Sequence, residues 1–145
     1  MSATARRSGG CLCGAVRFEG VVSARITACH CTQCQRWTGG GPLFSVGVRD
    51  LELTGEVHVK AYRHSTWGER AVCAVCGTTL FWRMQDQPVG FVAVGLLDDQ
   101  SGLTVTEEIF VDDRPGWMAP WPDAAQSTEA EEMAKLRAFL EGEAT

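Results

Sequence analysis

The sequence predicts a mainly β protein with a short helix near its C-terminal end. Two observations indicate the β class: short apolar segments that alternate with polar residues, and the Gly, Asp and Pro residues that bound them. The helix is indicated by a capping box, Thr128 followed by Glu131. With 145 residues, 45% of them hydrophobic, the chain suits one compact domain with its own core.

The strand pattern is clear near the N-terminus, where Val16 and Phe18 alternate with Arg17 and Glu19. Similar β-branched or aromatic segments recur along the chain. The segments expected as strands are 15–20, 24–29, 43–48, 51–53, 56–62, 79–83, 90–96 and 107–111. Short strands at close spacing with Gly-rich joints predict curled antiparallel sheets.

The composition changes after Val111. Residues 112–126 are rich in proline and carry Trp117 and Trp121, which we expect to pack on the body of the domain. The helix that follows has an apolar face by which it should dock. That face consists of Met133, Leu136, Phe139 and Leu140, and Gly142 is expected to end the helix.

Charge and hydropathy exclude several classes of partner. The formal net charge is −5, and the basic residues are dispersed along the sequence, so nucleic acid is not an expected partner. No run reaches the roughly 18 apolar residues of a membrane span. Residues 1–10 hold two arginines without an apolar stretch behind them, which differs from a secretory signal. We therefore expect a cytoplasmic protein; the sequence does not define its oligomeric state.

The seven cysteines are the main functional signal. An odd number argues against a complete disulfide framework, and Cys-x-Cys spacing is unfavourable for disulfide geometry. Metal binding explains the pattern better. The cysteines fall into a pair, a triple and a second pair: Cys11 and Cys13; Cys29, Cys31 and Cys34; Cys73 and Cys76.

A division into four and three ligands uses every cysteine. A structural zinc takes four ligands, whereas a catalytic zinc typically takes three and keeps one position open. The two pairs would form a closed four-cysteine site, and the triple would form an open three-cysteine site. Two alternatives remain at this stage: a thiol from a pair could join the triple, or His30 could be a ligand. His30 lies between two ligands on an extended backbone, so its side chain should point away from the metal.

The chain resembles the glutathione-dependent formaldehyde-activating enzyme family, which includes centromere-protein-V-like members. The resemblance is carried by three segments, GGCLCGAVRF, CHCTQCQRWTGG and CAVCGTTLF, and extends from about Gly10 to Trp117. It implies a β-tent zinc fold with two Zn²⁺ per chain, one structural on the four-cysteine site and one catalytic on the three-cysteine site. The segment IFVDDRPGW resembles the family's closing motif, in which a His often precedes the Ile; this chain has Glu108 there.

The resemblance also implies a reaction, and together with the composition of the two ends of the chain it suggests a domain plan. We expect a flexible lead over 1–9, a zinc-binding β domain over 10–121, and a C-terminal loop and helix over 122–145 packed on that domain. The implied activity is that of a carbon–sulfur lyase, as in S-(hydroxymethyl)glutathione synthase, with a small thiol such as glutathione and a small aldehyde as partners.

Several polar residues are candidates beside the catalytic zinc. His30 and Arg36 are the first choices, with Gln33 and Thr38 nearby, and Arg36 could pair with a substrate carboxylate. Arg63 and Arg70 could also pair with a substrate carboxylate.

Two other functions are compatible with the cysteine pattern. The chain could be a non-catalytic zinc-stabilised binding module in which both metals are structural. It could also be a redox switch in which the triple cycles with peroxide while the metal is lost.

Overall fold

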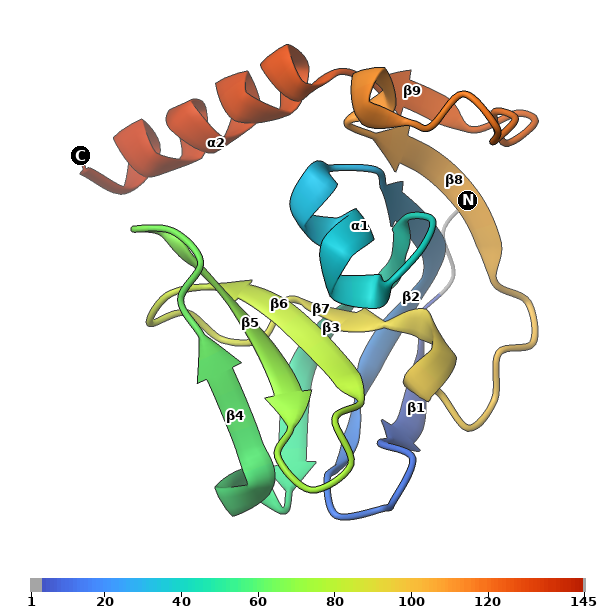
Figure 1. The fold of residues 1–145 in the computed structure, drawn as a ribbon. Coiled ribbons are helices and arrows are strands. Elements are labelled where there is room, and N and C mark those ends of the chain that lie inside the picture. The colour runs from blue at the N-terminus through green and yellow to red at the C-terminus, as the bar shows by residue number, and fades with distance from the viewer. Residues whose placement is uncertain (1–3, 145) are drawn as a thin grey trace. The chain divides into compact units, whose positions relative to one another are not determined.

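The structure is a computed structural model that describes residues 4–144, and it divides into two compact units (Figure 1). The first unit comprises the chain up to Ile26 and Phe44–Thr104. The second comprises Thr27–Leu43 and the chain from Val105 onward. Each cysteine group therefore lies within a single unit, the four-cysteine group in the first and the three-cysteine group in the second.

The first unit is built from antiparallel strand pairs. Its strands are β1 (Thr4–Gly10), β2 (Arg17–Cys29, of which residues up to Ile26 belong here), β3 (Leu43–Thr54), β4 (Val59–Tyr62), β5 (Gly68–Cys73), β6 (Thr79–Met84) and β7 (Phe91–Ala93). They follow the order β4-β5-β6-β7-β3-β2, and β1 pairs with β2. Two short 3₁₀ turns, η1 (Glu56–His58) and η2 (Val94–Leu96), interrupt the strand pattern.

The core of the first unit follows the alternation seen in the sequence. Phe18 and Val22 are buried on β2. They join Val46 of β3, Leu80 of β6 and Val92 of β7 in one hydrophobic cluster. Cys11 and Cys73 are buried in the same cluster, so two of the four thiols of this unit belong to its core.

The second unit holds the last residues of β2, from Thr27 to Cys29, together with the C-terminal elements. The unit contains α1 (Thr32–Thr38), β8 (Thr104–Ile109, of which residues from Val105 belong here), η3 (Val111–Asp113), β9 (Ala125–Ser127) and α2 (Glu129–Ala144). β8 is hydrogen-bonded to β2 on one side and β9 on the other. The β8–β9 pairing is parallel and brings Glu108 opposite Gln126.

The mainly β class with a C-terminal helix is confirmed. The boundaries differ from those expected because neighbouring short segments merge into long strands: 15–20 and 24–29 become β2, and 43–48 and 51–53 become β3. Residues 4–9 of the expected flexible lead form β1 together with Gly10, and β1 pairs with β2; residues 1–3 lie outside the described part of the chain.

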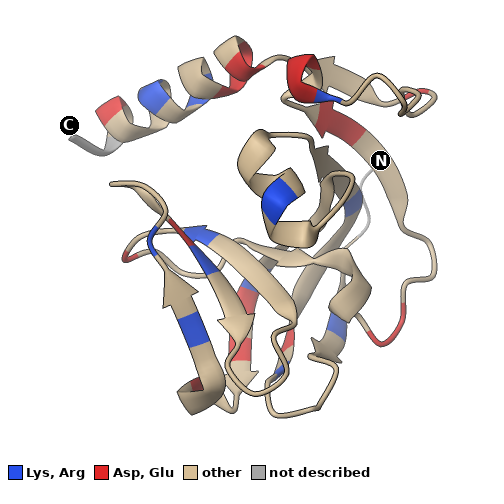
Figure 2. Ribbon diagram, viewed as in Figure 1, with Lys and Arg blue, Asp and Glu red and all other residues tan. Residues whose placement is uncertain are grey.

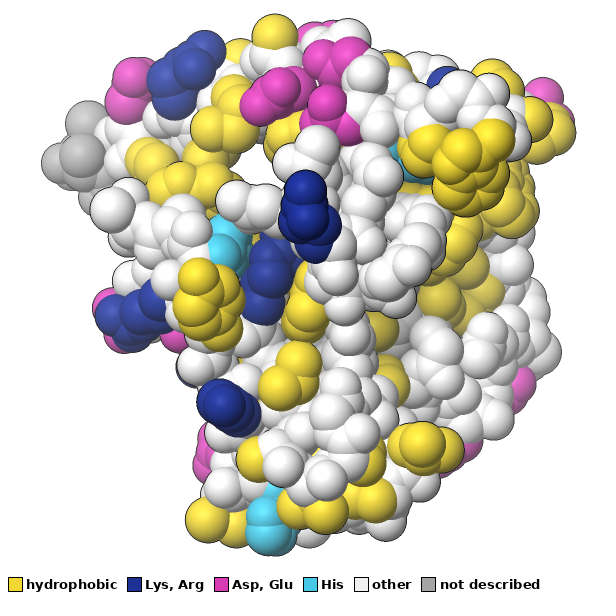
Figure 3. All heavy atoms as spheres, viewed as in Figure 1, with side chains coloured by type: hydrophobic (Ala, Val, Ile, Leu, Met, Phe, Trp, Pro, Cys, Tyr) yellow, Lys and Arg dark blue, Asp and Glu magenta, His cyan; other side chains and the backbone are white. Residues whose placement is uncertain are grey.

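Other local expectations need correction. Residues 56–58 and 94–96 form 3₁₀ turns in place of the ends of the expected strands. Trp117 is 74% exposed, and Trp121 is also exposed, in contrast to the expected packing on the body. The hydrophobic side chains near the loop before β9 are visible at the upper right of Figure 3.

The C-terminal helix begins as the sequence predicts. The Thr128 backbone N–H donates to Glu131 Oε1 at 3.0 Å, and the Glu131 N–H donates to Thr128 Oγ1 at 3.2 Å, which completes the capping box. Its apolar face is less covered than expected, since Phe139 and Leu140 are exposed and Met133 and Leu136 are half-buried.

Charged residues are spread over both units, with Lys and Arg on strands and on both helices (Figure 2). Within residues 4–144, no helix combines the length and the apolar character needed to cross a membrane.

Candidate metal centres

The four-cysteine site joins two segments that are distant in the sequence. Cys11 and Cys13 follow β1, whereas Cys73 ends β5 and Cys76 lies in the turn before β6. Their four Sγ atoms lie within 4.8 Å of one another. The Cys11–Cys13 distance is 3.6 Å and the Cys13–Cys73 distance is 3.9 Å, between sulfur atoms.

These distances fit a tetrahedral ion. Zinc–sulfur bonds of about 2.3 Å place the sulfur atoms of a tetrahedron about 3.8 Å apart. The two measured separations are close to that value, and all four ligands are thiols, the donor type that zinc prefers in structural sites. The residues present therefore fit a closed zinc site.

Backbone and hydroxyl groups orient the two ligand turns. The Val16 N–H donates to Cys11 Sγ at 3.3 Å, and the Leu12 N–H donates to Thr78 Oγ1 at 3.1 Å. In the second turn, the Gly77 N–H donates to the Cys73 carbonyl at 2.8 Å with Gly77 at φ +80°. Glycine adopts this left-handed conformation without steric cost, which explains its place directly after Cys76.

The thiols of this site differ in acidity. Hydrogen bonding to the hydroxyl and backbone of Thr78 lowers the pKa of Cys76 to about 5. At Cys13 the Ala15 N–H acts in the same direction, but burial and the neighbouring thiols outweigh it and raise the pKa to about 11. Four thiols this close cannot all ionise without a cation, so the cluster is chemically incomplete as thiolates alone.

The three-cysteine site is built where β2 ends and α1 begins. Cys29 is the last residue of β2, Cys31 is the N-cap of α1, and Cys34 lies in its first turn. Cys31 Sγ accepts the Cys34 N–H at 3.2 Å, so the thiol takes the place of the Ser, Thr or Asp side chain usual at this position. The three Sγ atoms lie within 4.8 Å of one another.

The local electrostatics favour a bound cation here also. Hydrogen bonding to Cys31 and Cys34, together with burial, raises the pKa of Cys29. Burial, the charge of Asp112 and that of Cys31 raise the pKa of Asp113 in the same unit. Three thiols fit three of the four positions of a tetrahedral zinc, and a divalent ion would relieve the repulsion among their ionised forms.

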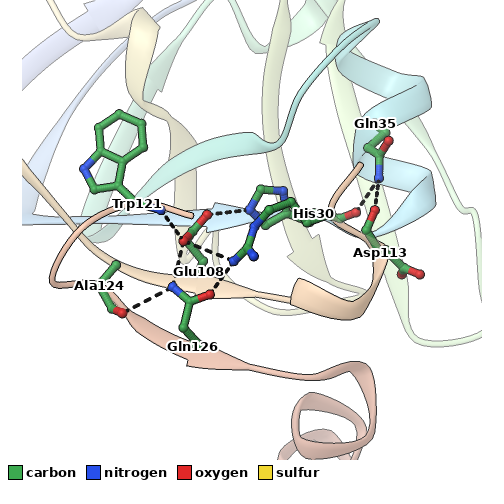
Figure 4. Close-up of polar contacts among 8 residues, drawn as sticks. His30, Gln35, Glu108, Asp113, Trp121, Ala124 and Gln126 are labelled. Atoms are coloured by element: carbon green, nitrogen blue, oxygen red, sulfur yellow. Dashed lines mark hydrogen bonds and ion pairs between the residues drawn. The ribbon is translucent and has the colours of Figure 1, made fainter. Parts of the chain in front are cut away.

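His30 is not part of this group of close ligand atoms. Its side chain is completely buried, and its Nε2 lies 2.7 Å from Glu108 Oε1 (Figure 4). The alternation argument agrees with this arrangement, since the residue between two ligands on extended backbone faces the other way.

Glu108 is the centre of a buried polar network. Its Oε1 contacts His30, and its Oε2 accepts hydrogen bonds from the Trp121 N–H at 2.8 Å, Gln126 Nε2 at 2.7 Å and Arg114 Nη2 at 3.2 Å. Burial by itself would raise the pKa of Glu108, but the donors Gln126, Trp121 and His30 and the charge of Arg114 together lower it. The carboxylate is therefore held in its charged form.

Sequence reasoning had named Glu108 only as a departure from the expected His. It missed Gln35, whose Nε2 donates to the His30 carbonyl at 2.7 Å and to the Asp113 carbonyl at 2.9 Å (Figure 4). Gln126 on β9 was missed as well, since its sequence neighbours give no local signal of a distant partner.

The remaining candidates have varied surroundings. Arg36 is exposed on α1, and Thr38 donates its hydroxyl to the Cys34 carbonyl at 2.9 Å. Arg63 contacts Glu69 and Asp86 at 3.3 and 3.4 Å. It is therefore engaged with carboxylates of its own chain.

A mainly β chain with one four-cysteine and one three-cysteine cluster defines a class of small β proteins whose thiols could hold metal ions. Within that class, the model of the family described as glutathione-dependent formaldehyde-activating enzyme matches residues 6–113, and the chain belongs to this family. The match includes all seven cysteines and ends before Arg114.

Two further comparisons found proteins that are similar to this chain, one in sequence and one in structure. A Schizosaccharomyces pombe protein described as an uncharacterized lyase is 25% identical over 109 residues, which cover 74% of this chain and 80% of that protein. A crystal structure of a Rhodobacter sphaeroides protein matches with a TM-score of 0.53 and 25% identity, covering 63% of this chain and 87% of that one.

Proposed function

We propose that the chain is a zinc-dependent carbon–sulfur lyase that joins a small thiol to a small aldehyde, or reverses that step, with glutathione and formaldehyde as the partners that the family name suggests. The main support is the difference between the two cysteine sites. One offers four close thiols, whereas the other offers three and leaves the fourth position of a tetrahedral ion to a substrate. Family membership and the lyase description of a relative support the same reaction class.

The chemistry is an addition to a carbonyl. The thiol sulfur forms a bond to the aldehyde carbon, the C=O π bond breaks, and the proton lost from sulfur is taken up by the aldehyde oxygen. Formaldehyde and glutathione would thus give S-hydroxymethylglutathione without a leaving group or an oxidant. The reverse reaction breaks the C–S bond, which defines lyase chemistry.

Zinc held by three thiolates would supply a Lewis-acidic position suited to a soft sulfur or a small carbonyl oxygen. Cys29, Cys31 and Cys34 are the residues proposed to hold it, and the four-cysteine site is proposed to hold a structural zinc. Arg36, exposed two residues after Cys34, is proposed to contact a substrate carboxylate. The complete burial of His30 assigns its ring to positioning in this proposal, in place of proton exchange with substrate.

The test is metal-dependent exchange of a thiol with formaldehyde. Because the addition also proceeds unaided, the rate is measured at equilibrium by NMR exchange between ¹³C-formaldehyde hydrate and its glutathione adduct. We expect the zinc-loaded protein to accelerate exchange and Cys31→Ser to abolish the acceleration while retaining one metal. Equal rates for the wild-type protein and Cys31→Ser would contradict the proposed function.

The coordination of the second metal decides between an enzyme and a binding module. X-ray absorption on protein loaded with two zinc ions should give an average of fewer than four sulfur ligands per zinc, with a light-atom ligand that added thiol replaces. Because two ions share seven cysteines, a light-atom ligand that added thiol leaves in place would favour the module.

A further inference from the structure

His30 is fixed at three points although it is not in the metal cluster. Its backbone N–H donates to the Ile109 carbonyl at 3.0 Å, its carbonyl accepts from Gln35 at 2.7 Å, and its Nε2 meets Glu108 at 2.7 Å. Since His30 lies directly between Cys29 and Cys31, these contacts hold the backbone from which the two thiols extend.

The Glu108 carboxylate is itself fixed by residues beyond the family match. Its Oε2 accepts from Arg114, the Trp121 backbone and Gln126, all of which follow residue 113. Gln126 is further held by the Ala124 carbonyl, which accepts from its Nε2 at 3.2 Å. The segment 114–126 therefore supplies three of the four donors around a buried carboxylate (Figure 4).

We propose that Glu108 is a positioning residue for the three-cysteine metal site, and that segment 114–126 is an integral part of that site. This inference rests on metal binding by the three cysteines, which belongs to the proposed function, and is independent of the substrate. The physical reason is that groups outside the ligand set fix ligand orientation, so their loss weakens metal binding by roughly 10–100-fold.

Glu108→Gln is the sharpest variant because it preserves size. Its oxygen can still accept from the three donors of segment 114–126, but its NH₂ group then faces His30 Nε2, which can accept from it only in the tautomer protonated at Nδ1. The Nδ1 atom of His30 is buried without a hydrogen-bond partner among the described residues. That tautomer would leave a buried Nδ1–H without an acceptor, so we expect the orientation of the ring to be lost while the fold persists.

Cobalt substitution gives a readout that does not require activity. Two Co²⁺ ions per chain should show thiolate charge-transfer bands and the visible bands of tetrahedral coordination, and chelator titration should separate the two sites. In Glu108→Gln, we expect the three-cysteine site to bind roughly 10–100-fold more weakly, with altered visible bands. The four-cysteine site, which lies in the other unit, should be unchanged and serves as an internal control.

Two more variants complete the design. Gln126→Ala removes one donor to Oε2 from outside the family match and should produce a smaller change in the same direction. Glu107→Gln, one residue earlier on β8, is the matched control, because its side chain accepts from Thr27 Oγ1 at 2.9 Å and its amide oxygen can do the same. We expect Glu107→Gln to match the wild-type protein at both sites.

The outcomes separate this inference from the proposed function. Two bound metals in the wild-type protein, with unchanged affinity and spectra in Glu108→Gln and Gln126→Ala, would overturn the inference alone. Equal weakening at both sites in Gln126→Ala would also overturn it, since the network would then serve general stability. A wild-type protein that binds one metal would overturn both proposals. Normal metal binding without thiol–aldehyde exchange would overturn the lyase function alone.

Discussion

Glu108 Oε1 lies 2.7 Å from His30 Nε2, and this buried contact joins two residues 78 positions apart in the chain. His30 separates two thiols of the three-cysteine site, and Glu108 lies on β8. The pair thus links the cysteine turn to the C-terminal segment inside one compact unit.

The two cysteine sites should respond differently to loss of one thiol. Cys31→Ser is expected to remove one metal and leave the chain folded, because the three-cysteine site spans only one turn of chain. Cys73→Ser should unfold the first unit, since that site joins segments 60 residues apart. Zinc content and thermal unfolding check both outcomes. Equal loss of stability in the two variants would contradict the division into a structural four-cysteine site and a catalytic three-cysteine site.

Glu69 should make stability depend on pH. It is buried on β5, and its Oε1 accepts from Arg83 Nε at 2.5 Å. Hydrogen bonding to Arg83 and, to a smaller extent, to Arg63 lowers the pKa of Glu69. A carboxyl group with a lowered pKa in the folded state contributes stability above its unfolded pKa of about 4.3, and that contribution is lost as the pH falls through the folded value.

Glu69→Gln should therefore lower the free energy of unfolding at pH 7 by about 2 kcal/mol. The difference from the wild-type protein should shrink as the pH falls below about 4.5. Urea unfolding at a series of pH values measures this difference. Glu52→Gln, at an exposed position on β3, is the control and should change little. A difference that stays constant down to pH 2 would show that the charge of Glu69 is not responsible.

Gly55 should not tolerate a side chain. It has φ +81°, and a Cβ built there would lie 1.8 Å from the Ala15 carbonyl oxygen. Gly55→Ala is expected to cost about 2 kcal/mol or more, from backbone strain and steric overlap. Gly95→Ala meets no heavy atom within 4 Å and should change stability by less than about 0.5 kcal/mol. Thermal unfolding compares the two variants. Similar melting temperatures would refute the close approach of Gly55 to the Ala15 carbonyl oxygen.

The capping box should hold the start of α2. Thr128→Ala removes the hydroxyl that accepts the Glu131 N–H and should cost about 1 kcal/mol of helix stability. Faster hydrogen exchange over residues 129–132 would report this loss, whereas Thr128→Ser should retain most of the protection. Metal content should be unaffected in both variants. Unchanged exchange in Thr128→Ala would mean that other contacts hold the helix.

Local features of the chain could be predicted well. The alternation of Phe18 with charged neighbours predicted a buried strand face, and the Thr128–Glu131 spacing predicted the start of α2. Both depend on residues a few positions apart, whose geometry is set by the element that contains them. The length of β2 and the existence of β1 could not be read in the same way, because strand pairing depends on distant partners.

The sequence by itself determined how the seven thiols divide into a pair, a triple and a second pair. Cys-x-Cys and Cys-x-x-Cys spacings bring the thiols of each group together within one turn of chain. Only the tertiary structure decided that the two pairs meet and that Glu108 faces His30. A buried carboxylate needs several donors at once, and here these come from Arg114, Trp121 and Gln126 as well as from His30. Folding alone assembles such a set, because no local pattern records which distant side chain a buried charge will meet.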